Sequence, residues 1–385
     1  GWIPVVLTVK RSRIPWEPTN AFIPAGIEIV RSVELNLHGV VAFSDAALYR
    51  VLRLLGWRTA PAYVRRALCV PDPQIAWLCV PAAVRLARAA DCVYVSCSPF
   101  SAAIWGAIVA KRCRKPLILD FRDPWMGSGL ERRLEEWVLR HADALILNTP
   151  QSQSAYARRF PELASRMVCI PNGYDVLAEP RPAGARSDMF TVMHVGEFYG
   201  TRRPDTLLEA MAELNLSDME FVQVGPGCPA LERYASRLRI RHIGLVPREQ
   251  ALELMQTASL LYLNMHEETD YSTMAVPAKT YEYLATGVPI LAECRPGDAV
   301  DLVKEFGTNP EIVTPGSKPE LAAALMRAYS RRHEPIGIVD SRFVQRFNRK
   351  YLTSQLASVL EHVVDREVRG LPSGRASAAR KAHVN

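Results

Sequence analysis

The alternation of short apolar runs with helical patterns constrains the fold of this chain more than any other feature. Apolar runs without a polar alternation are typical of parallel strands that are covered on both faces. Such runs occur in both halves of the chain, as PVVLTV, CVYVSC, LILDF, ALILNT and MVCIP, and then as FTVMHVG, MEFVQVG, RHIGLV, LLYLNM and PILAEC. Helical patterns such as ERRLEEWVLRHA and REQALELMQTA lie between them. Repeated strand–helix units predict an α/β fold with doubly wound sheets.

The series of strand–helix units breaks once, near the middle of the chain. Residues 172–188 are rich in Pro, Gly and Arg, which is typical of a linker. We therefore expect an N-terminal domain over 1–171 and a C-terminal domain over 189–335. A further helical segment is predicted over 336–366, and residues 367–385 have the small, polar and basic composition of a disordered tail.

Composition and charge narrow the classes of function. The 385 residues are 49% hydrophobic and 23% charged, as in a globular protein with a core. The net charge of +7 suits anionic partners such as phosphates, nucleic acid or an acidic membrane surface. Nucleic-acid binding is disfavoured, because the arginines are spread and no strand face interleaves basic with aromatic residues. Eight cysteines without a CxxC pair argue against a zinc site and a disulfide framework, and favour a reduced, cytoplasmic protein.

The sequence leaves membrane contact open. The uncharged run over 92–110 is long enough to span a bilayer, but Ser98 and Pro99 in its middle predict a helix start with serine as the cap. A strand followed by a helix is therefore the favoured interpretation. The basic, apolar segments RVLRLLGW and AYVRRALCV fit either peripheral contact with an anionic membrane, at the inner face of the cell membrane, or a solvated helix face.

A loop with one glycine and two arginines follows the predicted strand FTVMHV. In parallel sheets, ligands bind beyond the carboxyl ends of the strands. Gly196 lets the backbone approach a ligand, and Arg202 and Arg203 stand just before a predicted helix start. Arginine there can bind a diphosphate in a bidentate way. The alternative is a turn glycine with two surface arginines.

Two later strand ends carry weaker signals. Gly225 follows the strand MEFVQV, where a glycine admits a base or ribose close to the backbone, although a plain turn is an equal alternative. Leu245 and Val246 follow the run RHIG, and their backbone groups are candidates for contact with the edge of a nucleobase.

Polar side chains also end two strands of the first domain. Asp120, Arg122 and Asp123 follow the run LIL, and Asp123 can hydrogen-bond a sugar hydroxyl or accept a proton. The alternative is a structural ion pair between Asp120 and Arg122. The helix opening from Ser98 to Ser101 is expected to direct free N–H groups toward the same side as these residues.

The segment VPAKTYEYLATGVPIL combines a cation and a carboxylate at one helix start. Lys279 and Glu282 are three residues apart and share a helix face. A helix start attracts anions, and a carboxylate one turn further in can accept hydrogen bonds from a sugar diol. One helix end can therefore hold the diphosphate and the ribose of a nucleotide sugar. The alternative is an exposed Lys–Glu ion pair of little energetic weight.

Several of these motifs together resemble one enzyme family. The motif IPNGYD, the loop from Gly196 to Arg202 and the segment KTYEYLATGVPIL resemble the retaining glycosyltransferases of family 4, which have the GT-B fold. The motif DFRDPW resembles a bacterial subgroup that acts on polysaccharide or lipid-linked glycans. The resemblance implies two Rossmann-like domains facing a central cleft, a donor of the UDP-sugar or GDP-sugar type, a glycan or lipid-linked acceptor, and neither metal nor cofactor.

The resemblance also implies roles for individual residues. Glu282 matches the glutamate that binds the donor ribose, and Arg202 stands where the family has a phosphate-binding lysine. Arg202, Arg203 and Lys279 are then expected to stabilise the leaving diphosphate. Asp123 is expected to contact the transferred sugar or the acceptor.

Three features depart from the family pattern. Met274 stands where a second glutamate often contacts the donor sugar, and Glu197 stands where an arginine often follows the loop glycine. The chain begins at Gly1 within a strand-like run, so we expect the first strand and its Gly-rich loop to be missing. Two alternative functions therefore stay open, a GT-B nucleotide-sugar epimerase and a non-catalytic nucleotide-sugar-binding scaffold.

Overall fold

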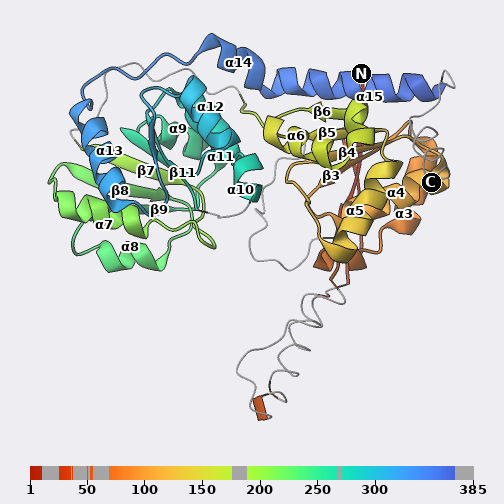
Figure 1. The fold of residues 1–385 in the computed structure, drawn as a ribbon, viewed down its shortest axis with the longest axis horizontal. Coiled ribbons are helices and arrows are strands. Elements are labelled where there is room, and N and C mark those ends of the chain that lie inside the picture. Colours follow the sequence, from red (N-terminus) through yellow and green to blue (C-terminus); the bar gives the residue numbers. More distant parts are fainter. Residues whose placement is uncertain are drawn as a thin grey trace. The chain divides into compact units, whose positions relative to one another are not determined.

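The structure of the protein is a computed structural model, in which the chain divides into two compact units (Figure 1). The structure describes residues 1–10, 26–35, 37, 50, 53–54, 69–175, 189–266 and 270–368. The first unit comprises residues 1–148, 156–169 and 356–385, and the second comprises 149–155 and 170–355. Both units are mixed α/β structures with parallel sheets, which confirms the predicted fold class.

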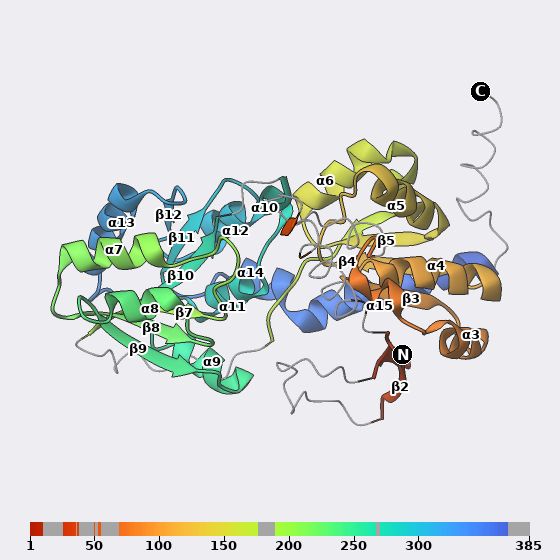
Figure 2. The same cartoon turned by 90° about the horizontal axis from the view of Figure 1, so that it is seen from below.

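The first unit is built on a four-stranded parallel sheet in the order β3-β4-β5-β6. Its strands are β3 (Val93–Cys97), β4 (Leu117–Phe121), β5 (Ala144–Leu147) and β6 (Met167–Cys169). Its helices are η1 (Pro73–Ala76), α3 (Val80–Ala89), α4 (Ser101–Cys113), α5 (Gly129–His141) and η2 (Pro161–Arg166), together with α6 (Pro150–Arg159) from residue 156 onward. Side chains of α4, α5 and α6 pack on one face of the sheet. Helix α3 lies beside α4 (Figure 2).

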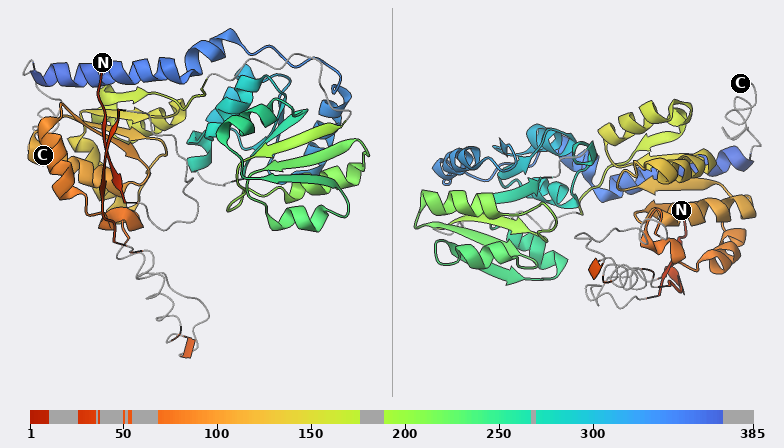
Figure 3. Two further views of the ribbon diagram at one scale, coloured as in Figure 1. Left: turned by 180° about the vertical axis from the view of Figure 1, so that it is seen from behind. Right: turned by 60° about the horizontal axis from the view of Figure 1, so that its bottom comes forward.

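The predicted strand PVVLTV forms, but outside the main sheet of the first unit. It is β1 (Val5–Val9), which pairs in parallel with β2 (Glu28–Ser32) in a sheet of two strands (Figure 3). The uncharged run over 92–110 is β3 followed by α4, as predicted, and no helix among the described residues is long and apolar enough to cross a bilayer. Most of RVLRLLGW and AYVRRALCV, residues 176–188 and the tail from 369 lie outside the described residues.

The predicted start of α4 is two residues too early. The helix begins at Ser101, its N-cap is Phe100, and no side chain of the cap residue closes the helix end. Instead, the Ser101 N–H donates to Oδ2 of Asp72 at 2.9 Å. A carboxylate 29 residues away in the sequence thus satisfies an N–H group that a local Ser98 cap would have served.

The second unit holds a six-stranded parallel sheet in the order β12-β11-β10-β7-β8-β9. Its strands are β7 (Phe190–Val195), β8 (Met219–Val224), β9 (Arg239–Gly244), β10 (Leu260–Met265), β11 (Ile290–Cys294) and β12 (Glu311–Val313). Its helices are α7 (Asp205–Leu214), α8 (Pro229–Tyr234), α9 (Arg248–Met255), α10 (Asp270–Met274), α11 (Ala278–Thr286), α12 (Asp298–Phe306), α13 (Lys318–Ser330) and α14 (Ser341–Phe347).

Helices cover both faces of this sheet, so each central strand is buried on two sides. Helices α7, α8 and α13 pack on one face, and helices α9, α11, α12 and α14 pack on the other (Figure 1). All six residues of β7, β8 and β10 are buried. This two-sided burial explains why the strands appear in the sequence as unbroken apolar runs.

The C-terminal helical segment is two helices, α14 and α15 (Arg349–Val368), separated at Asn348. Tyr174 lies against this break, because its N–H donates to the Phe347 carbonyl and its own carbonyl accepts from the Arg349 N–H. A Cβ at Gly173 would collide with the Phe347 carbonyl oxygen, so the motif IPNGYD needs its glycine for this close approach.

Candidate functional site

Three glycines with positive φ end the adjacent strands β7, β8 and β9. They are Gly196 (φ 120°), Gly225 (φ 125°) and Gly244 (φ 78°). The Gly196 N–H donates to the Val224 carbonyl at 2.8 Å, and the Gly225 N–H donates to the Gly244 carbonyl at 2.7 Å. A Cβ at Gly225 would come within 2.5 Å of the Gly196 oxygen, so only glycine fits there. The structure thus brings the predicted loops after the three strands together at one edge.

Lys279 extends from the first turn of α11 to this edge. A Cβ built on Gly196 would lie 2.9 Å from Lys279 Nζ, so the amine stands directly over the glycine. Desolvation lowers the pKa of Lys279 to about 8; the positive charge of Arg202 adds to this, and Glu282 opposes it. The positive charges of the two predicted phosphate ligands, Lys279 and Arg202, therefore repel one another.

His194 is a residue of this edge that sequence reasoning missed. It is fully buried in β7, its Nε2 lies 2.8 Å from Lys279 Nζ, and its Nδ1 lies 2.9 Å from Oε1 of Gln223. Burial, and then the charge of Lys279, hold the pKa of His194 well below its usual value. The only signal in the sequence is a histidine within an otherwise apolar strand, FTVMHV.

Glu282 lies one turn further along α11 and is held from one side. Nη2 of Arg248 donates to Oε1 of Glu282 at 2.8 Å, and Nη1 of Arg248 donates to Asp175 at 2.5 Å. The Glu282 side chain is 17% exposed. Lys279 and Glu282 thus have different partners, so they do not form the exposed Lys–Glu ion pair that was the alternative interpretation.

The other predicted donor-side residues lie on the loops at the same edge. The Arg202 guanidinium lies over the Tyr199 ring at 4.9 Å, and the exposed Arg203 donates from Nε to the Gly200 carbonyl at 3.4 Å. Leu245 is 81% exposed, whereas Val246 packs partly against the core.

The two departures from the family pattern have different surroundings. Met274 is buried, and its carbonyl accepts a hydrogen bond from Oγ1 of Thr149 at 2.8 Å. Its side chain therefore belongs to the core rather than to the polar edge. Glu197 is exposed on the loop after Gly196.

A buried carboxylate near the ends of β10 and β11 was also missed. Glu293 is fully buried; it accepts from the Tyr262 hydroxyl and from the Gly316 N–H, and it lies 3.1 Å from His266 Nε2. Little in the sequence pointed to Glu293, because it is a single charge in the run ILAEC. Among the residues that the structure describes, no group of three or more His, Cys, Asp or Glu side chains is placed to hold a metal ion.

In the first unit, Arg122 and Asp120 form the ion pair that was the alternative interpretation, with Nη2 of Arg122 2.5 Å from Oδ2 of Asp120. The Tyr94 hydroxyl also donates to Asp120, and Asn148 donates to the Arg122 carbonyl. Asp123, the next residue, is half-buried. These contacts fix the loop that carries Asp123.

Ser98 and Ser101 flank the turn between β3 and α4. Ser98 is exposed and Ser101 is buried. Because Asp72 accepts from the Ser101 N–H, the expectation of a free N–H group at that residue is wrong. Cys97 at the end of β3 pairs with Phe121 at the end of β4, so the Ser98 and Asp123 loops leave the same edge of this sheet.

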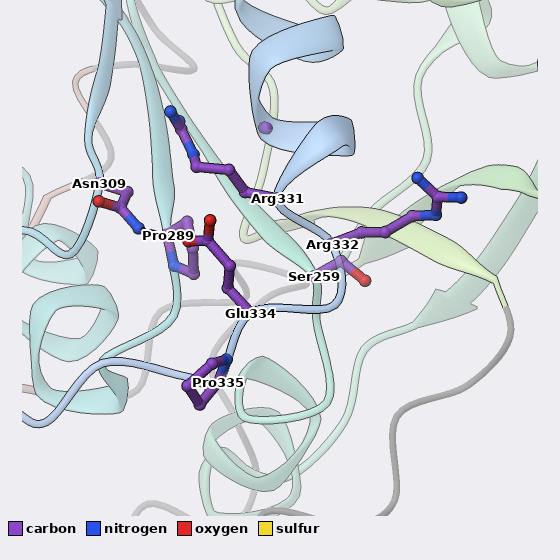
Figure 4. A pocket seen from close by; sticks show the side chains of 8 residues that line it. Ser259, Pro289, Asn309, Arg331, Arg332, Glu334 and Pro335 are labelled. Carbon is purple, nitrogen blue, oxygen red and sulfur yellow. Dashed lines mark hydrogen bonds between the residues drawn. The ribbon is translucent and has the colours of Figure 1, made fainter.

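One surface hollow of the second unit lies at the opposite end of its strands. Ser259, Pro289 and Asn309 precede β10, β11 and β12 at this end. Asn309 and Glu334 point toward one another there, while the Arg332 guanidinium points away (Figure 4). The hollow is therefore separate from the edge that carries Gly196 and Lys279.

Two family descriptions match the sequence. Residues 38–176 match Glycosyltransferase Family 4, and residues 189–331 match Glycosyl transferases group 1. A D-inositol 3-phosphate glycosyltransferase of Geodermatophilus obscurus is 27% identical over 231 residues, which cover 52% of this chain and 50% of that protein. The chain thus spans about half the length of this curated relative.

Several solved structures are similar to most of the chain. HepE of Anabaena in complex with UDP-glucose is 20% identical with a TM-score of 0.60, covering 88% of this chain and 86% of that chain. Its complex with UDP is 22% identical with a TM-score of 0.57, covering 74% and 82%. Sucrose-phosphate synthase of Thermosynechococcus elongatus is 16% identical with a TM-score of 0.61, covering 94% and 89%. At these identities the likeness establishes the fold alone, two Rossmann-like α/β domains.

Proposed function

We propose that this chain, whose residues 38–176 and 189–331 match glycosyltransferase families, transfers a sugar from a nucleoside-diphosphate sugar to an acceptor with retention of configuration. The observation that carries the proposal is the position of Lys279 Nζ over Gly196, at the edge where three strand-end loops meet. A cation over a glycine-opened backbone at a helix start is suited to a diphosphate.

The leaving diphosphate is the group that this edge would stabilise. Negative charge grows on it as the bond to the sugar breaks, and cations fixed in advance lower the energy of that transition state. Lys279, Arg202 and Arg203 are the residues that we assign to this role. The hydrogen bonds of Gly196 and Gly225 fix the loops at this edge, and Lys279 lies in the first turn of α11, so the cations need little reorganisation.

The nucleoside would lie along the neighbouring loops. Arg248 engages Oε1 of Glu282, so we assign the other oxygen, Oε2, to the hydroxyls of the ribose. Gly225 offers close backbone approach, and the backbone of Leu245 and Val246 would contact the base. The relative HepE is described with UDP and with UDP-glucose, which favours a UDP-type donor over a GDP-type donor.

The acceptor side would be formed by the first unit. We assign Ser98, Ser101, Arg122 and Asp123 to it, with Asp123 in contact with the acceptor or the transferred sugar. A retaining, front-face displacement would let the leaving phosphate take the acceptor proton. The acceptor would be a glycan or a lipid-linked glycan, reached in the cytoplasm with peripheral contact at the inner face of the membrane.

A donor panel followed by product analysis tests this function. Thermal shifts with UDP-, GDP-, ADP- and TDP-sugars identify the donor that stabilises the chain most. That donor is then incubated with glycan and lipid-linked acceptors, and the anomeric configuration of the product is read by NMR. Transfer with an inverted product would overturn the retaining mechanism. An epimer formed from donor alone would indicate an epimerase, and tight binding without turnover would indicate a scaffold.

A further inference from the structure

We propose that His194 is a positioning residue, whose Nε2 lone pair holds the Lys279 ammonium over the Gly196 loop, and that Gln223 fixes the tautomer that makes this possible. The inference rests on the proposed role of Lys279 toward the diphosphate. It adds a buried chain of hydrogen bonds from the loop backbone to the cation. None of the residues in this hydrogen-bond network is adjacent to another in the sequence.

The hydrogen-bond network begins with Gln223, whose amide orientation is fixed by two backbone carbonyls. Nε2 of Gln223 donates to the Gly196 oxygen at 2.6 Å and to the Pro226 oxygen at 3.1 Å. The flipped amide would place its oxygen against both carbonyl oxygens, which repel it. Gln223 therefore ties together the loops after β7 and β8, and its own Oε1 must face away from them.

The orientation of Gln223 decides the tautomer of His194. Oε1 of Gln223 only accepts, so His194 Nδ1, at 2.9 Å, must carry the hydrogen and donate it. The burial that holds the pKa of His194 well below its usual value keeps the ring neutral. A neutral ring protonated at Nδ1 has its lone pair on Nε2. That lone pair lies 2.8 Å from Lys279 Nζ, so Lys279 is the donor in this contact.

The ring of His194 is held in this orientation from two further sides. The Phe198 ring stacks on it with centroids 3.9 Å apart, and the Tyr262 ring meets it edge-on with centroids 6.3 Å apart. His194 is fully buried, so rotation of the ring would leave both of its nitrogens without partners. Packing and hydrogen bonds therefore act together to direct Nε2 toward Lys279.

The Lys279 amine needs such a partner because its surroundings disfavour its charge. Desolvation and the Arg202 guanidinium both lower the pKa of Lys279, while Glu282, itself paired with Arg248, raises it. An ammonium has three N–H groups. One of them is directed to His194, which leaves two for the oxygens of a diphosphate.

The tautomer of His194 can be measured in the wild-type protein. If His194 only filled space, its ring would not need to carry hydrogen at Nδ1. Long-range ¹⁵N–¹H correlation spectra distinguish a ring nitrogen that carries hydrogen from one that does not. We expect His194 to carry hydrogen at Nδ1 alone between pH 6 and pH 8. A hydrogen on Nε2 over this range would overturn the proposal without any substitution being made.

Two substitutions of His194 distinguish the effect of its Nε2 lone pair from the effect of its side-chain volume. His194→Gln retains an amide oxygen near the place of Nε2, whereas His194→Phe fills the site without an acceptor. Trace acetylation of the free chain between pH 6 and pH 11, followed by mass spectrometry, reports the titration of Lys279. We expect the midpoint in His194→Gln to stay within half a pH unit of the wild type, and that in His194→Phe to fall by at least one unit. Equal midpoints in all three chains would overturn the proposal.

These readouts need no donor, so their failure differs from failure of the proposed function. The wild-type protein could show the expected His194 tautomer and Lys279 titration and yet bind no nucleotide sugar. That result would support the hydrogen-bond network and reject the proposed function. If UDP-glucose binds, His194→Phe should weaken its affinity about tenfold and His194→Gln less than threefold. The reverse order, with His194→Gln the weaker binder, would contradict positioning by the Nε2 lone pair.

Discussion

Nη2 of Arg248 donates to Oε1 of Glu282 at 2.8 Å and so engages one oxygen of the carboxylate proposed to bind the ribose. Arg248 follows the loop after β9, whereas Glu282 lies in α11. The contact therefore joins the loop proposed to hold the base to the helix proposed to hold the diphosphate. Arg248 orients the carboxylate, and its exposed ion pair adds at most about 1 kcal/mol to stability.

Removal of the Glu282 carboxylate should weaken nucleotide binding at least tenfold, which is about 1.4 kcal/mol. The reason is the loss of a charged acceptor for the ribose hydroxyls. Calorimetry with the nucleoside diphosphate of the donor would compare Glu282→Ala with Glu253→Ala, an exposed glutamate of α9. Unchanged affinity in Glu282→Ala would remove the ribose role.

Substitution of Arg202 should lower turnover more than donor affinity. Charge grows on the diphosphate only as the sugar leaves, so a cation that acts there contributes most in the transition state. Arg202→Ala would be compared with Arg237→Ala, because Arg237 also lies over a tyrosine ring, Tyr234, on the same unit. An equal loss of kcat and donor affinity in Arg202→Ala would indicate plain ground-state binding.

The strands could be predicted where burial on both faces requires an unbroken apolar run in the sequence. β7, β8 and β10 are apolar on both faces, and the sequence shows this directly. β12 was missed because its three residues are too short for a periodicity to be read.

Much of the candidate site depends on partners that are distant in the sequence. Lys279 and Glu282 were found because a helix start is a local pattern. The histidine that holds Lys279 is 85 residues away, and the carboxylate that binds the Ser101 N–H is 29 residues away. Such contacts are set by the order of strands in the sheet, which propensity and spacing do not contain.

Donor affinity should be independent of pH below about 8 and should fall above it. Lys279 titrates with a pKa of about 8 in the free chain, and a bound diphosphate favours its charged form. Above pH 8 binding must therefore take up a proton, and affinity should drop by up to about tenfold per pH unit. Calorimetry with UDP-glucose from pH 6.5 to pH 9.5 checks this.

A variant that keeps its charge is the control for this pH profile. Lys279→Arg carries a guanidinium that stays protonated throughout the range, so its profile should be flat. His194 is not the titrating group, because its pKa lies well below its usual value. A flat profile for the wild type, or the same decline in Lys279→Arg, would assign the pH dependence elsewhere.

A methyl group at Gly225 should destabilise the second unit and weaken donor binding together. The new Cβ would meet the Gly196 oxygen at 2.5 Å, in a backbone conformation with φ 125° that side chains rarely adopt. Gly316→Ala is a suitable control, because Gly316 also has a positive φ, 78°, but no atom within 4 Å of a new Cβ. Denaturant unfolding should show a larger loss in Gly225→Ala than the roughly 1–2 kcal/mol expected for backbone strain alone. Equal losses would contradict the close approach of the two loops.

The substitution Lys279→Met should stabilise the folded chain and abolish donor binding. The pKa of Lys279 falls from 10.5 to about 8 in the folded chain, and at pH 7 this difference costs about 3 kcal/mol by the 1.36 kcal/mol per unit relation. Lys279→Met removes that cost but leaves His194 Nε2 without its donor, which offsets about 1 kcal/mol or more. A net gain of about 1–2 kcal/mol is expected at pH 7, measured by denaturant unfolding.

The sign of this gain with pH identifies its cause. Between pH 8 and pH 10.5 the unfolded chain binds more protons than the folded chain at Lys279, so the wild type gains stability as pH rises and the advantage of Lys279→Met shrinks. Lys318→Met is the opposite case, because the hydrogen bonds that Lys318 donates to Glu213 and Glu209 raise its pKa, and its loss should lower stability slightly at pH 7. A Lys279→Met variant that is less stable than the wild type at pH 7, or whose advantage grows toward pH 10, would contradict a desolvated ammonium at this edge.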